Sequence, residues 1–370
     1  IKKIMNQKKL LIFMPSVEGG GVEKNFFLIS NNLCQKFKNI SVITVDKTIK
    51  KNLNNKINII GPNSNIWKSK SRYPKYFICL VYLFIFLLFN RNTIVFSFQA
   101  NAYASIISKL LCKKIITRSN SSSEGWSKNY FKKILYKILL KLPDQVIVNS
   151  YEFKKELDNK FGINSLVIYN PLNKFEIIKK SKRKTSFKFF KKNKLKLITI
   201  GRLVDQKDQF TMVKSINLLR DKKIQLLIIG QGSNQNKIQE YIFNKNLSKI
   251  IKIISFQKNP YKYLRLADVF LLTSKFEGLP NVLLEAQCLK KYIISTDCPT
   301  GPKEILLKGT LGDLIKIGDY KNLSKKINYY INNKKKFKKK ITNAYKNLNR
   351  FDYNYNMYKY QKIIKKYIYY

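Results

Sequence analysis

Two glutamates that lie close together in the chain, Glu277 and Glu285, are well suited to hold a carbohydrate. They flank the run Gly278-Leu279-Pro280-Asn281, which lies between two apolar segments. A carboxylate accepts several hydrogen bonds and can therefore bind paired sugar hydroxyls. Backbone N–H groups at the start of a helix can also bind hydroxyls or phosphate oxygens. Two spaced glutamates alone would favour the alternative, in which Glu277 is a helix cap and Glu285 an ordinary residue on the surface of a helix.

Two basic residues, Arg202 and Lys207, follow an apolar segment that ends at Gly201. An arginine fork and a lysine point charge can stabilise a diphosphate that gains negative charge as a bond to it breaks. The alternative is plain solvation, because the chain has 73 basic residues. The sequence has no D-x-D motif and no histidine, so we expect no metal site, no histidine base and no Ser-His-Asp triad.

The elements that must position these residues alternate between short apolar strands and helical patterns. In the first half, a strand at 10–14 leads through Gly19-Gly20-Gly21 into a helix, and in the second half the alternation restarts at 195–200. This pattern predicts an α/β fold of two Rossmann-like, doubly wound parallel-sheet domains. Because ligands of such sheets bind beyond the carboxyl ends of the strands, we expect the site in a central cleft that the two domains face.

The predicted domain boundaries follow the change of composition in the middle of the chain. The first domain is expected over 1–175 and the second over 194–349. Residues 176–193 are rich in Lys and Ser with little periodicity, and they are expected to form an exposed basic linker. A C-terminal helix over 350–370 is expected to pack back on the first domain.

The net charge is +52, from 73 basic and 21 acidic residues. An anionic membrane surface would be a fitting partner for such a chain. The alternative is compositional drift of the sequence towards Lys, Asn, Ile, Phe and Tyr. It also explains the positive charge, because the lysines are spread along the whole chain. A nucleic-acid partner is disfavoured, since no helix-turn-helix, RRM or zinc-finger pattern occurs in the sequence.

The longest apolar run, 76–89, has fourteen residues, fewer than the ~20 that span a bilayer. We expect a buried helix there, with a membrane-contact helix as the alternative. Five cysteines without a C-x-x-C pair, and no evident signal peptide, favour a cytoplasmic protein. If the apolar run contacts lipid, the protein is peripheral on the inner face of the cell membrane.

The run EGLPNVLLEA, residues 277–286, resembles the signature of the large retaining glycosyltransferase family four, which has the GT-B fold. Further segments resemble motifs of that family in the same order along nearly the whole chain. These segments are Gly19-Gly20-Gly21-Val22-Glu23, Tyr169-Asn170-Pro171, Gly201-Arg202-Leu203 with Gln206-Lys207-Asp208, 227–232 and 295–306. One such motif is weak support, whereas six in the right order are strong support.

The resemblance implies a metal-independent hexosyltransferase of surface polysaccharide or lipopolysaccharide biosynthesis. It would move a hexose or N-acetylhexosamine from a nucleotide diphosphate sugar to a glycan or lipid-linked oligosaccharide. The variant at 301–306 looks most like relatives that use UDP-sugars, and no cofactor is implied.

By the same resemblance, the domain over 1–175 is on the acceptor side and the domain over 194–349 binds the nucleotide sugar. Arg202 and Lys207 would bind the diphosphate, Glu277 would position the transferred sugar and Glu285 would hold the ribose hydroxyls. The leaving phosphate itself would accept the acceptor's proton, so Glu277 need not be a nucleophile. The remaining donor-binding residues implied by the motifs are Gly20, Gly21, Gly201, Gly278, Leu279, Pro280 and Asn281.

The sequence departs from many relatives in lacking the histidine that lines their sugar site from the first domain. Asn101, Arg118 and Asn120 lie in the corresponding region and are expected on the acceptor or sugar side, with structural roles as the alternative. Two other functions stay open. The first is a GT-B-fold sugar nucleotide epimerase, which would be expected to have acid/base carboxylates and histidines in its cleft. The second is a catalytically inactive basic scaffold, which would be free to lose the charged set Arg202, Lys207, Glu277 and Glu285.

Overall fold

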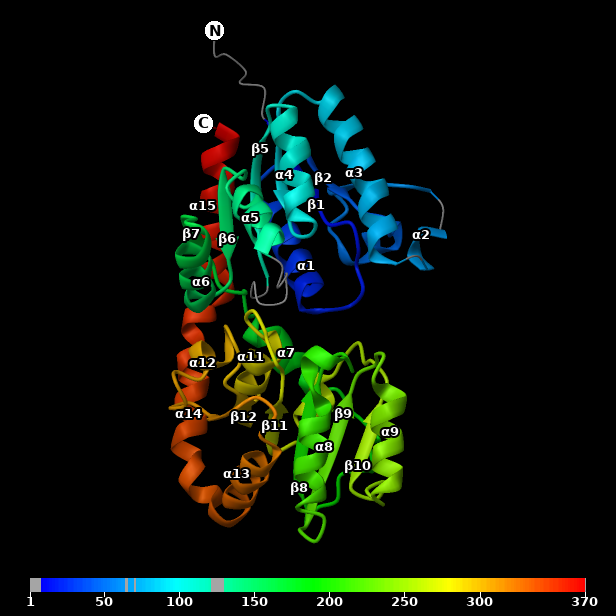
Figure 1. The fold of residues 1–370 in the computed structure, drawn as a ribbon, viewed down its shortest axis with the longest axis vertical. Coiled ribbons are helices and arrows are strands. Elements are labelled where there is room, and N and C mark those ends of the chain that lie inside the picture. Colours follow the sequence, from blue (N-terminus) through cyan, green and yellow to red (C-terminus); the bar gives the residue numbers. More distant parts are fainter. Residues whose placement is uncertain (1–7, 64–65, 70, 121–129, 370) are drawn as a thin grey trace. The chain divides into compact units, whose positions relative to one another are not determined.

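The computed structural model describes residues 8–63, 66–69, 71–120 and 130–369 (Figure 1). It divides into two compact units. The first comprises Ile1–Pro171 and Asn354–Tyr370, and the second comprises Leu172–Tyr353. The chain therefore leaves the first unit after Pro171 and returns to it at Asn354.

The first unit is built on a seven-stranded parallel sheet with the strand order β3-β2-β1-β4-β5-β6-β7. Its strands are β1 (Lys9–Phe13), β2 (Ile40–Ile43), β3 (Asn58–Ile60), β4 (Thr93–Ser97), β5 (Lys114–Arg118), β6 (Gln145–Val148) and β7 (Ser165–Val167). Its helices are α1 (Gly21–Leu33), η1 (Lys47–Asn52), α2 (Ile66–Ser69), α3 (Arg72–Phe89), α4 (Asn101–Leu110), α5 (Tyr130–Leu139), α6 (Tyr151–Phe161) and α15 (Tyr353–Tyr369).

The second unit repeats this plan with the parallel strand order β10-β9-β8-β11-β12-β13. Its strands are β8 (Leu195–Ile200), β9 (Ile224–Ile229), β10 (Ile251–Ile254), β11 (Val269–Leu272), β12 (Tyr292–Thr296) and β13 (Asp313–Ile315). Its helices are α7 (Lys174–Ser181), η3 (Asp205–Lys207), α8 (Gln209–Asn217), α9 (Gln235–Asn244), α10 (Tyr261–Leu264), α11 (Asn281–Cys288), α12 (Pro302–Ile305), α13 (Tyr320–Asn333), η4 (Lys334–Phe337), α14 (Lys338–Asn347) and η5 (Leu348–Phe351).

Both sheets have the doubly wound strand order, so the predicted fold class of two Rossmann-like α/β domains is confirmed. In each sheet the winding direction reverses between two neighbouring strands, β1 and β4 in the first unit and β8 and β11 in the second. Connecting loops diverge at such a switch point, and the carboxyl ends of the two strands are left open to a ligand. The central strands are largely apolar and buried, as in β9, where all six residues are buried, because a parallel sheet of this kind is covered on both faces.

The predicted linker over 176–193 is wrong. Helix α7 occupies its first part, with Ile177 and Ser181 buried, and it packs against α10 and α11 of the second unit. The ring of Phe187 then lies 5.1 Å from that of Tyr263 in α10. The aromatic residues of this segment therefore bind it to the second unit, despite its many lysines.

The predicted buried helix over 76–89 is also wrong. Helix α3 begins at Arg72 and buries only a narrow stripe that includes Cys79, Leu83 and Leu87. Large apolar residues on its other side are exposed, among them Phe77 at 69% and Phe89 at 82%.

Candidate functional site

Lys207 and Glu277 meet at the switch point of the second sheet. Strand β8 ends at Ile200 and leads through Gly201 and Arg202 to η3, which carries Lys207. Strand β11 pairs directly with β8, and the loop that follows it carries Glu277. Two residues that are 70 positions apart in the sequence are thus brought together because their strands are neighbours.

Glu277 is 6% exposed, and its carboxylate is held by two donors. The Lys207 ammonium forms an ion pair with Oε1, and the Ser274 hydroxyl donates to the same oxygen at 2.6 Å. A buried carboxylate is costly to desolvate unless it is paired and hydrogen-bonded, and both conditions are met here. The pair therefore holds one cation and one anion in charged form at the carboxyl ends of β8 and β11.

The side chain of Lys207 is guided by its surroundings. Its stem lies 3.9 Å from the position that a β-carbon on Gly201 would occupy. The Thr273 hydroxyl, at the end of β11, donates to the carbonyls of Lys207 and Asp208 at 3.2 and 2.8 Å. The backbone of η3 is thus fastened to the neighbouring strand, which fixes the origin of the lysine side chain.

Arg202 is exposed, and its side chain has no hydrogen-bond or ion-pair partner within the described part of the chain. Its own carbonyl accepts from the Gln209 amide at 2.8 Å, which holds the backbone in place. The guanidinium is thus a cation at the end of β8 that no carboxylate of the described residues neutralises. It can bind a diphosphate without first releasing a partner.

The loop that carries Glu277 rests on the loop after β12. Gly301 has a φ of 82°, and a β-carbon there would lie 1.8 Å from the carbonyl oxygen of Gly278. The Glu277 N–H donates to the Pro299 carbonyl at 3.3 Å, and the Thr300 hydroxyl donates to the Glu277 carbonyl. This close approach of two backbones requires glycine at position 301 and fixes the position of the Glu277 loop relative to the loop after β12.

The remaining residues of the signature lie around the start of α11. Gly278 and Leu279 are buried, and Pro280 is the N-cap residue of α11. Asn281 begins the helix. Pro280 still fits this place, since its missing N–H has no helical partner to lose.

Glu285 lies in the second turn of α11 and is 5% exposed. Its carboxylate accepts a hydrogen bond from the hydroxyl of Tyr261, in α10, at 3.2 Å. Tyr261 was not identified from the sequence, because a four-residue helix carries no recognisable motif. Ser274 was also missed as a partner of Glu277, although it stands three residues before it.

Cys298 lies close to the Lys207–Glu277 pair but cannot serve as a thiolate nucleophile. Burial, together with the negative charge of Glu277, raises the pKa of Cys298 to about 12. The thiol therefore stays protonated at neutral pH.

No group of three His, Cys, Asp or Glu side chains that could hold a metal ion occurs among the described residues. Metal independence remains a prediction that rests on the sequence.

At the switch point of the first sheet, the protein's own carboxylate occupies the glycine loop. The Gly20 N–H, predicted to bind phosphate, donates to Oε2 of Glu23 at 2.8 Å. The Glu18 N–H donates to Oε1 of the same side chain at 3.3 Å. Glu23 is the third residue of α1, which begins at Gly21, and it caps that helix from within. The structure thus differs from the prediction for Gly20, whose N–H already has an anionic acceptor.

Glu18 is held in turn by the residues around it. The Ser16 hydroxyl donates to its Oε1 at 2.8 Å, and the Lys75 ammonium, from α3, lies 3.4 Å from the same oxygen. Burial favours the neutral acid, but the Ser16 hydrogen bond and the charge of Lys75 outweigh it and hold the pKa of Glu18 below its usual value. This corner of the first unit therefore carries two carboxylates at the strand ends.

Asn101, Arg118 and Asn120 form a structural network within the first unit. Arg118 is fully buried, and its guanidinium donates to the Tyr360 hydroxyl at 2.8 Å and to the Asn170 side chain. The Asn101 and Asn120 amides both donate to the Arg118 carbonyl, at 3.0 and 3.2 Å. The prediction that Arg118 faces a ligand is therefore wrong, because this side chain anchors α15 instead.

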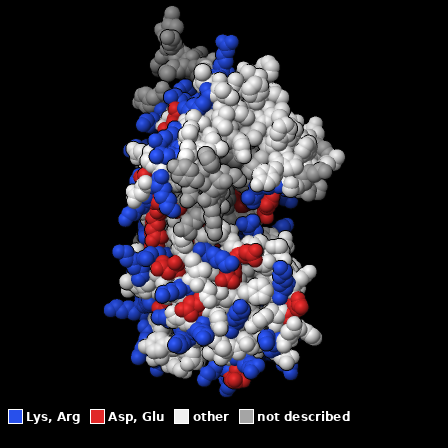
Figure 2. Space-filling model, in the orientation of Figure 1, with Lys and Arg blue, Asp and Glu red and all other residues white. Residues whose placement is uncertain are grey.

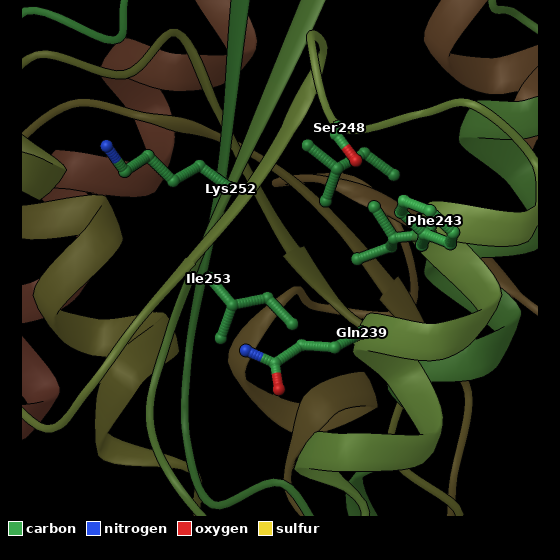
Figure 3. Close-up of a pocket in the computed structure, with 7 residues that line it drawn as sticks. Gln239, Phe243, Ser248, Lys252 and Ile253 are labelled. Atoms are coloured by element: carbon green, nitrogen blue, oxygen red, sulfur yellow. The ribbon is translucent and has the colours of Figure 1, made fainter.

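A hollow elsewhere in the second unit is distinct from these residues. It is lined by Gln239, Ile242, Phe243, Ser248, Ile251, Lys252 and Ile253, from α9, β10 and the loop between them (Figure 3). The Lys252 side chain points away from the other labelled residues, and its ammonium lies 6.0 Å from the centre of the Phe187 ring. The hollow belongs to the edge strand of the sheet and contains none of the candidate site residues.

Comparison with known proteins identifies the second unit. Residues 181–347 match the family model of glycosyl transferases group 1. An uncharacterized glycosyltransferase of Methanocaldococcus jannaschii is 32% identical over 233 residues, which make up 58% of this chain and 57% of that protein. The chain thus spans little more than half the length of this relative.

Two further proteins are similar over almost the whole chain. The N-acetylgalactosamine-N,N'-diacetylbacillosaminyl-diphospho-undecaprenol 4-alpha-N-acetylgalactosaminyltransferase of Campylobacter jejuni is 23% identical, over 92% of this chain and 93% of its own length. The crystal structure of Anabaena HepE in complex with UDP-glucose superposes with a TM-score of 0.78 at 16% identity, over 97% of this chain and all of the other. The fold is therefore GT-B.

Proposed function

Because residues 181–347 match the family model of glycosyl transferases group 1, we propose that the chain is a metal-independent, retaining glycosyltransferase. It moves a hexose or N-acetylhexosamine from a UDP-sugar to a glycan or lipid-linked oligosaccharide of the cell surface. The observation that carries the proposal is the Lys207–Glu277 pair beside the unpaired Arg202 at the β8/β11 switch point. The acceptor class follows the Campylobacter relative, whose acceptor is carried on diphospho-undecaprenol.

In the proposed reaction, the bond between the anomeric carbon and the diphosphate oxygen breaks and the diphosphate takes the electron pair. Arg202 and Lys207 stabilise the charge that develops on the diphosphate, which is the largest electrostatic demand of the step. The acceptor hydroxyl forms the new bond on the same face of the sugar and passes its proton to the leaving phosphate. No protein nucleophile is needed.

The two glutamates bind and orient the donor. Glu277, which Ser274 and Lys207 hold in place, positions the transferred sugar through its hydroxyls. Glu285, oriented by Tyr261, accepts hydrogen bonds from the two ribose hydroxyls. The Gly278–Asn281 loop supports the sugar from the start of α11.

Nucleotide release from a panel of UDP- and GDP-sugars, measured in EDTA, tests the proposal. We expect UDP release from one or a few UDP-sugars, a sharp loss in Glu285→Ala, and no loss in Glu240→Ala. Glu240 is the matched control because it is an exposed glutamate on α9, away from the switch point.

Each alternative has its own result. Release that EDTA abolishes contradicts metal independence, and release of GDP alone contradicts the donor assignment. If neither nucleotide release nor nucleotide binding is found, the transferase proposal fails and the inactive scaffold is favoured.

A further inference from the structure

The outer face of α3 is apolar and exposed. Tyr73 is 78% exposed, Phe77 is 69% exposed and Leu88 is 46% exposed, and no charged residue occurs from Tyr76 to Asn90. A surface helix of a water-soluble domain normally carries polar and charged residues on the face that it turns to solvent. The outer face of α3 lacks them, which marks it as a surface that another partner covers.

By length and composition α3 could cross a membrane, since Arg72–Phe89 has a mean hydropathy of 1.6. Its inner stripe, however, is part of the hydrophobic core of the first unit. Cys79, Leu83 and Leu87 are fully buried in one cluster with Leu11 and Val95 of the central strands. A helix that packs along a sheet in this way can offer only its outer face to lipid, as an interfacial helix does.

Neighbouring helices extend the apolar surface. Helix α4 packs against α3 and exposes Tyr103 at 54% and Leu110 at 73%. Helix α5, next to α4, exposes Leu135 and Ile138. Figure 2 shows the result as a broad surface without charged side chains over α3 and α4, whereas basic side chains are scattered over the second unit.

Positively charged residues stand at both ends of α3, and the Glu18 carboxylate beside this helix is paired with Lys75. Between Asp46 and Glu124 the sequence has no acidic residue. Arg72 begins α3 and Arg91 follows its end, and both are exposed. An apolar face framed by arginines complements a bilayer with anionic headgroups, where each basic residue near the surface adds attraction. A second copy of this chain, with the same arginines and a net charge of +52, would be repelled instead.

We propose that the outer face of α3, extended by α4, docks on a membrane surface that contains anionic lipids. The same helix contributes Lys75, whose ammonium pairs with Glu18 in the glycine loop of the first unit. The glycine loop is thus joined by an ion pair to the helix that is proposed to dock. The statement that the enzyme meets a lipid-linked acceptor at the membrane surface rests on the proposed function. The binding of lipid by α3 does not rest on it.

Cosedimentation of the full chain with extruded vesicles tests the docking surface. One set of vesicles contains phosphatidylcholine alone, and the other contains phosphatidylcholine and phosphatidylglycerol in a two-to-one ratio. We expect binding to the second set, weakened by salt. Phe77→Ser, Phe84→Ser and Leu88→Ser combined should lower the affinity by at least about tenfold, because each removes apolar area that lipid would cover.

The matched control is Leu218→Ser combined with Phe243→Ser, which replaces exposed apolar residues of the second unit. This control should bind vesicles as the unmodified chain does. Circular dichroism of each variant establishes that the fold is kept, and donor hydrolysis without acceptor should be the same in all of them. If the unmodified chain hydrolyses no donor, the proposed function fails, whereas the result of the vesicle-binding experiment still stands.

Three results would overturn the inference. The first is that the α3 variant binds vesicles as well as the unmodified chain does, and the second is that vesicles without anionic lipid bind the chain equally well. Alternatively, sedimentation velocity in the absence of lipid shows a dimer that the α3 variant dissociates, in which case a second copy covers this face.

Discussion

The two sheets have the same strand order around their switch points, yet the residues at those points have opposite character. In the second unit, the β8/β11 ends carry Arg202, unpaired, and Lys207, paired with Glu277. In the first unit, the β1/β4 ends carry Glu18 and Glu23, and Glu23 accepts from the N–H groups of the glycine loop. The same topology thus places cations beside the strand ends in one unit and carboxylates in the other.

This difference shows that a doubly wound sheet offers a position for a ligand but does not determine which charge the ligand has. Anion binding at a helix start needs N–H groups that are free to donate. In α1 the Gly20 N–H is already used by Glu23, whose negative charge is also favourable at a helix N-terminus. The proposed function therefore places donor binding in the second unit, and variants of the two switch points test this placement.

The largest effect is expected from Lys207→Met, which removes a cation from the diphosphate. Turnover should fall by about a thousandfold. Stability should fall by about 3 kcal/mol, because Glu277 is left buried without its partner. Steady-state kinetics and thermal unfolding measure the two effects. In the double variant Lys207→Met with Glu277→Gln, stability should largely return while turnover does not. A single variant with normal turnover would exclude Lys207 from the reaction.

Gly301→Ala should be nearly as damaging. Its β-carbon would lie 1.8 Å from the Gly278 carbonyl oxygen, so the Glu277 loop must move. We expect a loss of at least about tenfold in kcat/KM, since a misplaced positioning group is costly.

Gly318→Ala is the matched control for this change. Gly318 has a similar φ, 76°, but no atom lies within 4 Å of a β-carbon built there. It should cost only about 1 kcal/mol of stability from backbone strain and leave turnover unchanged. Equal effects of the two variants would mean that strain, and not loop displacement, is responsible.

In the first unit, Glu23→Ala should act on stability more than on the donor. The N–H groups of Glu18 and Gly20 lose their acceptor, at a cost of about 1–2 kcal/mol. Glu23→Gln, which keeps one acceptor oxygen, should lose less. Thermal unfolding measures both variants. A gain in UDP affinity in Glu23→Ala, measured by calorimetry, would show that the first unit binds phosphate once its carboxylate is removed.

The smallest effect is expected from Tyr261→Phe. Loss of the hydrogen bond to Glu285 should raise KM for the donor by about three- to tenfold and leave kcat nearly unchanged. Tyr263→Phe is the control, since the Tyr263 hydroxyl, from the same helix, donates to Gln257 at 3.2 Å and not to Glu285. A fall in kcat with unchanged KM would contradict a positioning role in donor binding.

Much of the fold could be predicted from the sequence, because long apolar strands such as β8 and β9 stand out from the helices between them. Strands β3 and β13 could not be predicted, since three residues give no periodicity and their pairing at the sheet supplies the signal. The exposure of α3 was equally hidden. A helix that is apolar on all sides has the same composition whether protein or another partner covers its outer face.

The site could be predicted as a set of residues but not as a geometry. Lys207 and Glu277 were both identified, yet their ion pair depends on the adjacency of β8 and β11, which no local motif records. Arg118 was misassigned for a related reason. Its partner Tyr360 lies 242 positions away in the sequence, so the residues near Arg118 in the sequence do not indicate that Arg118 is buried.

The helix α15 has a consequence for how the protein is made. Residues 354–369 supply Tyr360 to Arg118, Gln361 to Asn32 and Tyr367 to the Asp144 carbonyl, all within the first unit. The ribosome completes these residues only after it has made all of the second unit. The usual order, in which the N-terminal domain folds first, is therefore reversed here. The sequence of the second unit is thus complete before that of the first, which waits for α15 while Arg118 still lacks the Tyr360 hydroxyl.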